Sequence, residues 1–336
     1  MEITFYNTND GIHFPELGLW LDSSENAQSG EMVFVSHAHS DHISKHSELI
    51  LSPPTSRLLK LRYLRPRKEH IMEFFQPRNF SHNGIDYRLT LLPAGHVLGS
   101  SMLYIEAGNT SILYTGDFKL GSPITSEPCK PQRADFLIIE STFGKPGYNF
   151  PDVSVITREI TSFCKMTLSE NKIPVLFAYS LGKSQDVIKL LSKDGFNIMV
   201  HEQIYKTVSV YRRFGVSLPT VEKFSPSKAK DKVLIMPPAA KNFFNEIKKE
   251  KIKTALLTGW AVDKDILYRC ETDAAFALSN HSDYQELIDF VKIVNPRKIF
   301  TVHGFSSEFA LDLKNRGYDA EALEESGQKW LPLGKF

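Results

Sequence analysis

The chain begins with short segments in which apolar and polar residues alternate, as expected for β-strands that bury one face. These segments are residues 1–6, 17–22, 32–39, 85–96, 101–108, 110–117 and 135–142. Several end in a polar cluster. When strands present their loops at a common edge, such clusters are where functional residues gather.

From about residue 152 the pattern changes to amphipathic helices that alternate with apolar strands. The helices are expected at 153–168, 184–193, 203–215 and 241–251, and the strands at 175–180, 197–202, 232–238 and 254–260. This alternation is typical of a parallel sheet built from βαβ units. The chain closes with a strand at 275–280, a helix at 282–294, a strand at 298–304 and a helix near 307–316. We therefore predict an α/β protein with a β-rich first part, an inserted α/β segment and a return to the first domain.

Composition describes an ordinary globular protein. The 336 residues suffice for one large domain or two smaller ones, and 42% are hydrophobic and 24% charged. The net charge of +1 gives no global positive field, so any phosphate-binding surface must be local.

Three scattered cysteines without CxxC spacing argue against a disulfide framework and a thiolate zinc site. No apolar run approaches the roughly 18 residues of a membrane span. The first residues also lack the pattern of a secretion signal. We expect a soluble, cytoplasmic protein with no membrane partner; the sequence leaves the oligomeric state open.

Four of the eleven histidines, together with Asp41, fall within residues 37–46. His37 and His39 stand two apart at a strand end, so both side chains can point at one spot. Asp41 and His42 follow at what reads as the start of a helix and can point back at a neighbouring spot. Two cations a few Å apart suit this HxHxDH spacing. The alternative is an exposed polar turn whose histidines bind nothing.

One loop does not complete two metal shells, but three later strand ends supply further ligand types. They are His96 in "PAGH", Asp117 in "YTGD" and His303 in "TVHG". Each alone could be structural. Together they provide the imidazoles and carboxylate that the first loop lacks.

With these residues the sequence resembles the metallo-β-lactamase fold, and specifically its β-CASP nucleases. The order HxHxDH, His, Asp, His is the metal signature of that fold. The resemblance implies a four-layer αββα domain over residues 1–150 and 279–336, and an inserted parallel-sheet β-CASP domain over 151–278. It also implies two Zn²⁺ ions, with Mn²⁺ as a possible substitute.

Carried over position by position, the resemblance assigns three residues to one metal, three to the second, and Asp117 as the bridge between them. The first metal would take His37, His39 and His96, and the second Asp41, His42 and His303. Asp22, which ends "GLWLD", would orient ligands from behind.

Further residues carry the β-CASP assignment. "IIESTFG" resembles motif A with Glu140, "LSNHSDY" resembles motif B with His281, and "VHG" resembles motif C with His303. The likeness is greatest to small exonucleases associated with DNA ligases and to proteins like the mRNA 3′-end-processing factor. Motif C here continues to Phe305, where relatives often have Glu.

The expected reaction is hydrolysis of phosphodiester bonds by a hydroxide that bridges two zinc ions, with Asp41 among the catalytic residues. His281, oriented by Glu140 or another carboxylate, would protonate the leaving 3′-oxygen, unless it is a structural histidine. We expect a nuclease, an exonuclease of DNA repair or processing, with DNA favoured over RNA. A ribonuclease of the ribonuclease J or 3′-end-processing type is the alternative. The about 140 residues between Glu140 and His281 count against a thioester or lactam hydrolase, since small-substrate relatives have no such insert.

Two segments suggest phosphate contacts. In "YSLGKS", a Walker A loop would need glycine where Phe177 stands. The helix start with Ser180, Lys183 and Ser184 could still receive one phosphate of a polynucleotide, or these residues could simply cap the helix. The segment 57–68 carries six cations and no acid, which suits either phosphate tracking or a solvated helix face.

Overall fold

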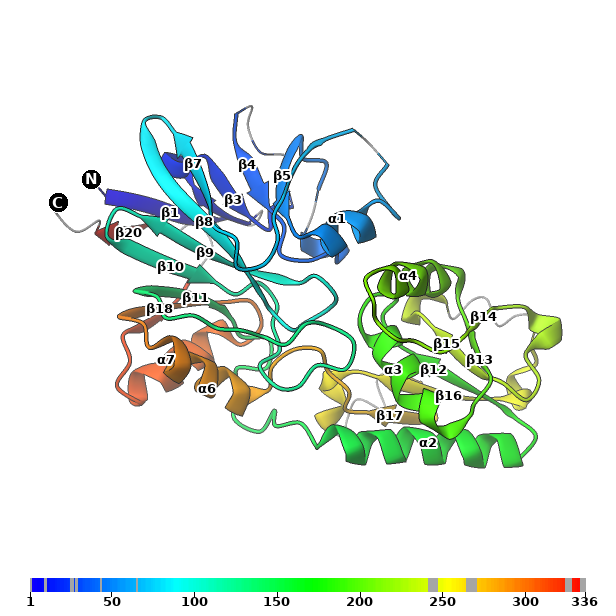
Figure 1. Cartoon of the computed structure of the whole chain (residues 1–336). Helices are drawn as coiled ribbons and strands as arrows, with labels where there is room; N and C mark the ends of the chain where they lie inside the picture. The colour runs from blue at the N-terminus through cyan, green and yellow to red at the C-terminus, as the bar shows by residue number, and fades with distance from the viewer. Residues whose placement is uncertain are drawn as a thin grey trace. The chain divides into compact units, whose positions relative to one another are not determined.

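The computed structural model describes residues 2–8, 11–24, 27, 30–42, 44–64, 66–240, 247–263, 271–323 and 328–332, with the backbone alone at 2, 41 and 328–332. The chain divides into two compact units, each of which is visible in Figure 1. Unit 1 comprises Met1–Pro123, Glu127–Tyr148 and His281–Phe336, and unit 2 comprises Ile124–Ser126 and Asn149–Asn280.

Unit 1 contains two seven-stranded sheets. The first has the order β20 (Gln328–Pro332), β1 (Glu2–Thr8), β2 (Gly11–Phe14), β3 (Leu19–Leu21), β4 (Met32–Phe34), β5 (Glu48–Leu51) and β6 (Lys68–Ile71). The second has the order β19 (Ala320–Ala322), β18 (Lys298–Val302), β11 (Phe136–Glu140), β10 (Thr110–Tyr114), β9 (Ser101–Ala107), β8 (Ile85–Pro93) and β7 (Arg78–His82).

Apolar side chains from both sheets form the central core of unit 1. Phe5 and Phe14 of the first sheet and Phe300 of the second belong to it, and the rings of Phe5 and Phe300 meet edge to face with centroids 5.0 Å apart. The other face of the second sheet packs against α6 (Tyr284–Val294) and α7 (Ser306–Asn315), as Figure 1 shows. The short helix α1 (Pro53–Leu59) contacts β6 of the first sheet.

The functionally important feature of unit 1 is the edge at which its parallel strands end. In the second sheet β10, β11 and β18 are parallel, and β8 runs the same way because two antiparallel pairings separate it from β10. In the first sheet β3 and β4 are parallel. Residues that follow these strands therefore gather at a shared edge, as ligand-binding residues do in open α/β sheets.

Unit 2 is built around a six-stranded sheet in which every pairing is parallel. Its order is β14 (Glu222–Lys223), β13 (Ile198–Val200), β15 (Val233–Met236), β12 (Ile173–Phe177), β16 (Ile252–Leu257) and β17 (Ala274–Phe276). Helices α2 (Val153–Ser169), α3 (Lys183–Leu191) and α4 (Glu202–Arg213) contribute to the core on this sheet. None of the described helices has the length and apolar character that a membrane crossing requires.

The α/β class, with stacked sheets, flanking helices and an inserted parallel sheet, is confirmed. Two local expectations were wrong. The strand expected over 32–39 ends at Phe34, and the helix expected to begin at Asp41 is a single 3₁₀ turn, Ser40–His42. Of the helix expected over 241–251, residues 241–246 lie outside the described residues, and Lys249–Lys251 form another 3₁₀ turn.

Candidate metal centre

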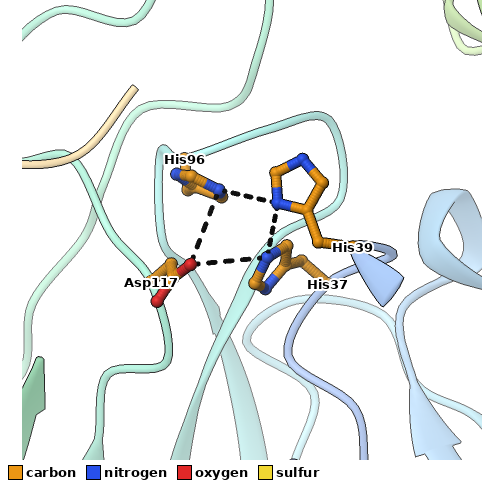
Figure 2. Close-up of side chains that lie close together, drawn as sticks. All are labelled: His37, His39, His96 and Asp117. Atoms are coloured by element: carbon orange, nitrogen blue, oxygen red, sulfur yellow. Dashed lines mark hydrogen bonds and ion pairs between the residues drawn. The ribbon is translucent and has the colours of Figure 1, made fainter. Parts of the chain in front are cut away.

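Four donor atoms from three strand ends of unit 1 lie within 4.8 Å of one another. His37 Nε2 is 2.9 Å from His39 Nδ1, and His96 Nε2 is 3.3 Å from the same atom. Asp117 Oδ2 lies 3.6 Å from His37 Nε2 and 3.8 Å from His96 Nε2 (Figure 2). The structure thus brings together residues from positions 37 to 117.

Backbone packing fixes the two loops that carry these ligands. The Ser101 amide donates to the carbonyl of Ser36, 2.8 Å away, which ties β9 to the residue before His37. Gly116 has φ +51°, and a Cβ at this position would lie 2.6 Å from the Ser36 Cβ. Glycine before Asp117 therefore lets the two loops approach closely.

His42 also approaches Asp117, and its ring lies 4.2 Å from that of His37. Its Nε2 is 3.4 Å from Asp117 Oδ2, and its Nδ1 is 3.2 Å from Asp22 Oδ2. Asp22 is itself held by the Ser36 amide at 2.7 Å and by the Tyr114 hydroxyl at 2.8 Å. One oxygen of Asp117 thus lies within 3.8 Å of an Nε2 atom of three imidazoles.

His303 follows β18 and lies near His42, with ring centroids 6.1 Å apart. His303 and Gly304 both have left-handed φ values, +59° and +58°. The hydroxyl of Ser141 donates to the His303 carbonyl at 2.6 Å, and a Cβ on Gly304 would lie 2.4 Å from the Thr142 Cα. Motif C therefore rests directly against motif A. The side chain of Asp41 lies outside the described residues.

The chemistry of this donor set fits a metal ion. Burial, reinforced by the neighbouring His42 and His39, holds the pKa of His37 well below its usual value, so its imidazole is neutral. Burial alone would raise the pKa of Asp117, but His42 and His281 outweigh it and hold that pKa well below its usual value. A neutral imidazole and an ionised carboxylate are zinc ligands, and tetrahedral bonds of about 2.0–2.1 Å place donors about 3.3 Å apart.

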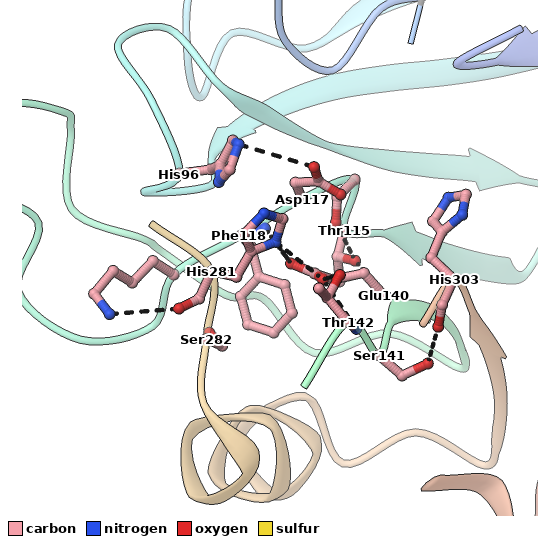
Figure 3. A network of polar contacts seen from close by, with 12 residues as sticks. His96, Thr115, Asp117, Phe118, Glu140, Ser141, Thr142, His281, Ser282 and His303 are labelled. Atoms are coloured by element: carbon pink, nitrogen blue, oxygen red, sulfur yellow. Dashed lines mark hydrogen bonds and ion pairs between the residues drawn. The ribbon is translucent and has the colours of Figure 1, made fainter. Parts of the chain in front are cut away.

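Beside this donor set, His281 and Glu140 form a tightly held pair. His281 Nδ1 lies 3.0 and 3.2 Å from the two Glu140 oxygens, and the His281 and His96 rings are 4.5 Å apart (Figure 3). Glu140 is buried and also accepts from the Phe118 amide at 3.0 Å. An oxygen or nitrogen of Asp117, Glu140 and His281 also lies within 4.8 Å of the others, so this trio is close enough to share an ion.

The local chain explains where His281 stands. Asp283 caps α6 by accepting from the Glu286 amide at 2.9 Å, and Glu286 accepts in return from the Asp283 amide. The Ser282 amide donates to the Phe118 carbonyl at 2.8 Å. The start of a packed helix therefore fixes His281 beside the residues that follow Asp117.

The residues of the other predicted site lie in unit 2. The Ser184 hydroxyl donates to the Tyr179 carbonyl at 2.7 Å, and the Ser180 hydroxyl lies 3.4 Å from Gln203 Oε1. Lys183 is buried with its ammonium 5.1 Å from the centre of the Tyr179 ring, and burial lowers its pKa to about 8. Neither serine caps α3, because the N-cap residue is Gly182 and a capping hydroxyl would accept from a backbone amide instead of donating to a carbonyl.

Sequence reasoning missed the residues that hold the candidate ligands from behind. Tyr114 reaches Asp22 across 92 positions, and Thr115 accepts from the Glu140 amide at 3.1 Å. No motif marks a tyrosine or threonine for such a role. At the departure in motif C, the Phe305 amide donates to the Ser141 carbonyl at 2.9 Å, so this position contributes through its backbone.

Comparison with known proteins adds evidence on the family. Residues 269–323 match the model described as "Zn-dependent metallo-hydrolase RNA specificity domain". A probable DNA ligase of Opitutus terrae is 41% identical over 325 residues, covering 96% of this chain and 31% of that protein. The human DNA cross-link repair 1A protein is 26% identical over 292 residues, covering 79% of this chain and 27% of that protein. The chain thus spans about a third or less of these relatives.

A solved structure shares the fold. A protein of unknown function from Enterococcus faecalis V583 superimposes with a TM-score of 0.65 at 12% identity, and the match covers 98% of this chain and all of that one. The motifs in the sequence, the two stacked sheets with their inserted segment and these relatives agree. Together they support a place for the chain in the β-CASP group of the metallo-β-lactamase fold.

Proposed function

We propose that this chain is a metal-dependent nuclease that hydrolyses phosphodiester bonds of DNA, as an exonuclease of repair or processing. The observation that carries the proposal is the convergence of His37, His96 and His42 on one oxygen of Asp117. The similarity to the DNA cross-link repair protein and the probable DNA ligase favours DNA. A cytoplasmic location is part of the proposal and is supported by two buried free cysteines.

The same proposal assigns the two metallo-β-lactamase segments to residues 1–150 and 279–336, and the β-CASP domain to 151–278. The residues that would hold two Zn²⁺ ions fall into two groups around Asp117. His37, His39 and His96 form one group, and Asp41, His42 and His303 form the other. When bound, the ions supply an activated water at neutral pH and offset the charge that develops on the phosphoryl oxygens.

The protein's own groups set the orientation of the imidazoles. His42 Nδ1 faces Asp22 and His37 Nδ1 faces the Ser36 hydroxyl at 2.9 Å, so Nε2 of both rings is directed at Asp117. A partner on the second ring nitrogen fixes the tautomer and makes the ligand more basic. Asp22 and Ser36 therefore act as positioning residues.

His281 is positioned to serve the leaving oxygen. Because Glu140 accepts from Nδ1, the Nε2 atom of His281 would carry the proton that neutralises the leaving 3′-oxygen. Glu140 fixes the ring with Nδ1 toward the carboxylate, which leaves Nε2 as the atom that takes up and delivers the proton. We assign proton donation to His281 and its positioning to Glu140.

RNA is the second candidate substrate. One observation favours it: the match over residues 269–323 to a domain described by RNA specificity. The deciding experiment is digestion of end-labelled single- and double-stranded DNA and RNA, with Zn²⁺ and Mn²⁺ compared. We expect stepwise shortening of DNA that depends on metal. Preferential cutting of RNA would make RNA the substrate in place of DNA. No cutting of any polynucleotide would contradict the proposed function.

Tyr114→Phe tests the support behind the metal ligands. The change removes only the hydroxyl that donates to Asp22 and preserves the buried ring. Because partners behind a ligand tune its affinity, zinc affinity should fall roughly 10- to 100-fold with little change in fold. Isothermal titration with Zn²⁺ measures this. Tyr104→Phe, a change on the neighbouring strand β9, is the control, and equal affinities for both variants would remove Asp22 from its assigned role.

A phosphate contact at Ser180, Lys183 and Ser184 stays a prediction. If Lys183 contacts a backbone phosphate, Lys183→Met should weaken the salt dependence of polynucleotide binding. The slope of log affinity against log salt concentration should become shallower by about 0.7. If Lys183 only packs beneath Tyr179, the variant should bind polynucleotide like the wild type. Fluorescence anisotropy at a series of salt concentrations separates the two outcomes.

A further inference from the structure

A pocket of about 480 Å³ lies where α1 ends and the chain turns toward β6. It belongs entirely to unit 1 and is here called the α1 pocket. Its walls combine charged groups with an aromatic and three apolar side chains. They are Arg57, Lys60, Leu61, Tyr63, Leu64, Pro66, Arg67 and Glu69.

The charge of the α1 pocket is positive. Three cations face one acid, and Glu69 already pairs with Lys60 at 2.9 Å and with Arg67 Nε at 2.8 Å. These two partners and the Ser56 hydroxyl hold the pKa of Glu69 below its usual value, although burial opposes them. Arg57 makes no ion pair within the described part of the chain. An anion entering the pocket would therefore meet a net positive surface.

Arg67 gives a second indication of an anionic ligand. Its side chain is only 8% exposed, and its buried Nη2 has no hydrogen-bond partner among the described residues. A buried guanidinium nitrogen without an acceptor is unusual in a folded protein. Guanidinium groups bind phosphate oxygens well because their donors lie in one plane.

The α1 pocket is attached to the loops that carry the candidate metal ligands. The hydroxyls of Ser52 and Thr55, at the start of α1, donate to the Gly99 carbonyl at 2.6 and 3.0 Å, in the loop that follows His96. Just past the end of α1, the Arg62 guanidinium lies 3.5 Å from the carbonyl of Ala38, between His37 and His39. This basic segment therefore lies beside the loop that carries His37 and His39.

The apolar walls indicate the form of the strand. Leu64 is 87% exposed, and Tyr63 stands beside it in the lining. Cations interleaved with aromatic and apolar side chains suit a single strand, whose bases are exposed to the protein. In a duplex those bases are stacked and paired.

We propose that the α1 pocket binds a backbone phosphate of a single-stranded stretch of the polynucleotide substrate, next to the metal centre. The proposal rests on the nuclease function above and adds the residues that bind the strand. Arg57 and Arg67 contact the phosphate, and Tyr63 contacts the adjoining base.

Binding of a fluorescent oligothymidine in EDTA tests the α1 pocket without the metal chemistry. Arg57→Gln should weaken binding roughly 3- to 10-fold and reduce the log–log salt slope by about 0.7, since one phosphate contact is lost. Tyr63→Ala should weaken binding roughly 5-fold or more and leave the slope unchanged, because a stacked ring carries no charge. Arg133→Gln is the matched control. Arg133 is exposed and lies just before the start of β11, whereas Glu140, beside the metal centre, is at the other end of this strand.

The outcomes separate this proposal from the nuclease function. If the wild type cuts polynucleotides but Arg57→Gln and Arg133→Gln bind oligothymidine alike, the proposed role of the α1 pocket is wrong and the nuclease function stands. If Arg57→Gln lowers the slope in a protein that never cuts, the nuclease function fails and the binding pocket stands. A wild type that binds no polynucleotide would overturn both.

Discussion

Asp117→Asn should reduce cleavage by on the order of 10³-fold and lower the content of both metal ions. Asp117 Oδ2 lies 3.4 to 3.8 Å from an Nε2 atom of His42, His37 and His96, so a single oxygen lies near three candidate ligands. Asparagine preserves the shape of the side chain but removes the negative charge that would hold two cations together in the proposed site. Metal analysis of the purified variant and a cleavage assay measure the two effects.

Asp289→Asn is the control for the loss of one negative charge in the same unit. Asp289 lies on α6, where it is 45% exposed and pairs with Lys292. This variant should keep both metals and the wild-type rate. If Asp117→Asn did the same, the bridging role assigned to Asp117 would be wrong.

His281→Ala should keep both metal ions and lose about 10²- to 10⁴-fold in kcat, the range for a positioned general acid. The loss should shrink on a nitrophenyl phosphodiester, because that leaving group departs without a proton. Glu140→Gln should lower kcat in the same direction by a smaller factor, since the His281 ring keeps a hydrogen-bonding partner but loses the charge beside it. Comparing kcat on the two substrates isolates the leaving-group step.

His303→Ala provides the contrast, since it should lose metal and fail on both substrates. Asp117, Glu140 and His281 also lie close enough together to hold an ion, so His281 could act as a metal ligand instead. If His281→Ala lost metal and failed equally on both substrates, His281 would be a ligand or a structural support. Proton donation would then have to come from another group.

The strand ends explain why so many residues of the candidate site could be predicted from the sequence. An apolar run that stops at His96, Asp117 or His303 marks both a buried strand and a polar loop, and parallel pairing then brings such loops to one edge. Local patterning is enough for this. The long amphipathic helix α2 was equally clear, because its 17 residues show the helical period over several turns.

Short elements and distant partners carry no such signal. β6 and β7, exposed at sheet edges, lack a run of buried residues, so their pattern does not stand out. Ser141 supports His303 across 162 positions, a contact set by the pairing of β11 with β18 rather than by sequence spacing. The α1 pocket could not be predicted either. The sequence of residues 57–68 shows six cations, but it does not show that Lys60 and Arg67 pair with Glu69 or that Arg62 approaches Ala38.

The most direct test of the central claim is a Zn²⁺ titration of the protein after removal of metal with a chelator, with cleavage of an end-labelled oligonucleotide followed at each step. We predict no cleavage in the metal-free protein, binding of two equivalents per chain, and full activity only when the second is bound. Binding of fewer than two equivalents, or cleavage that survives complete removal of metal, would contradict a two-metal nuclease.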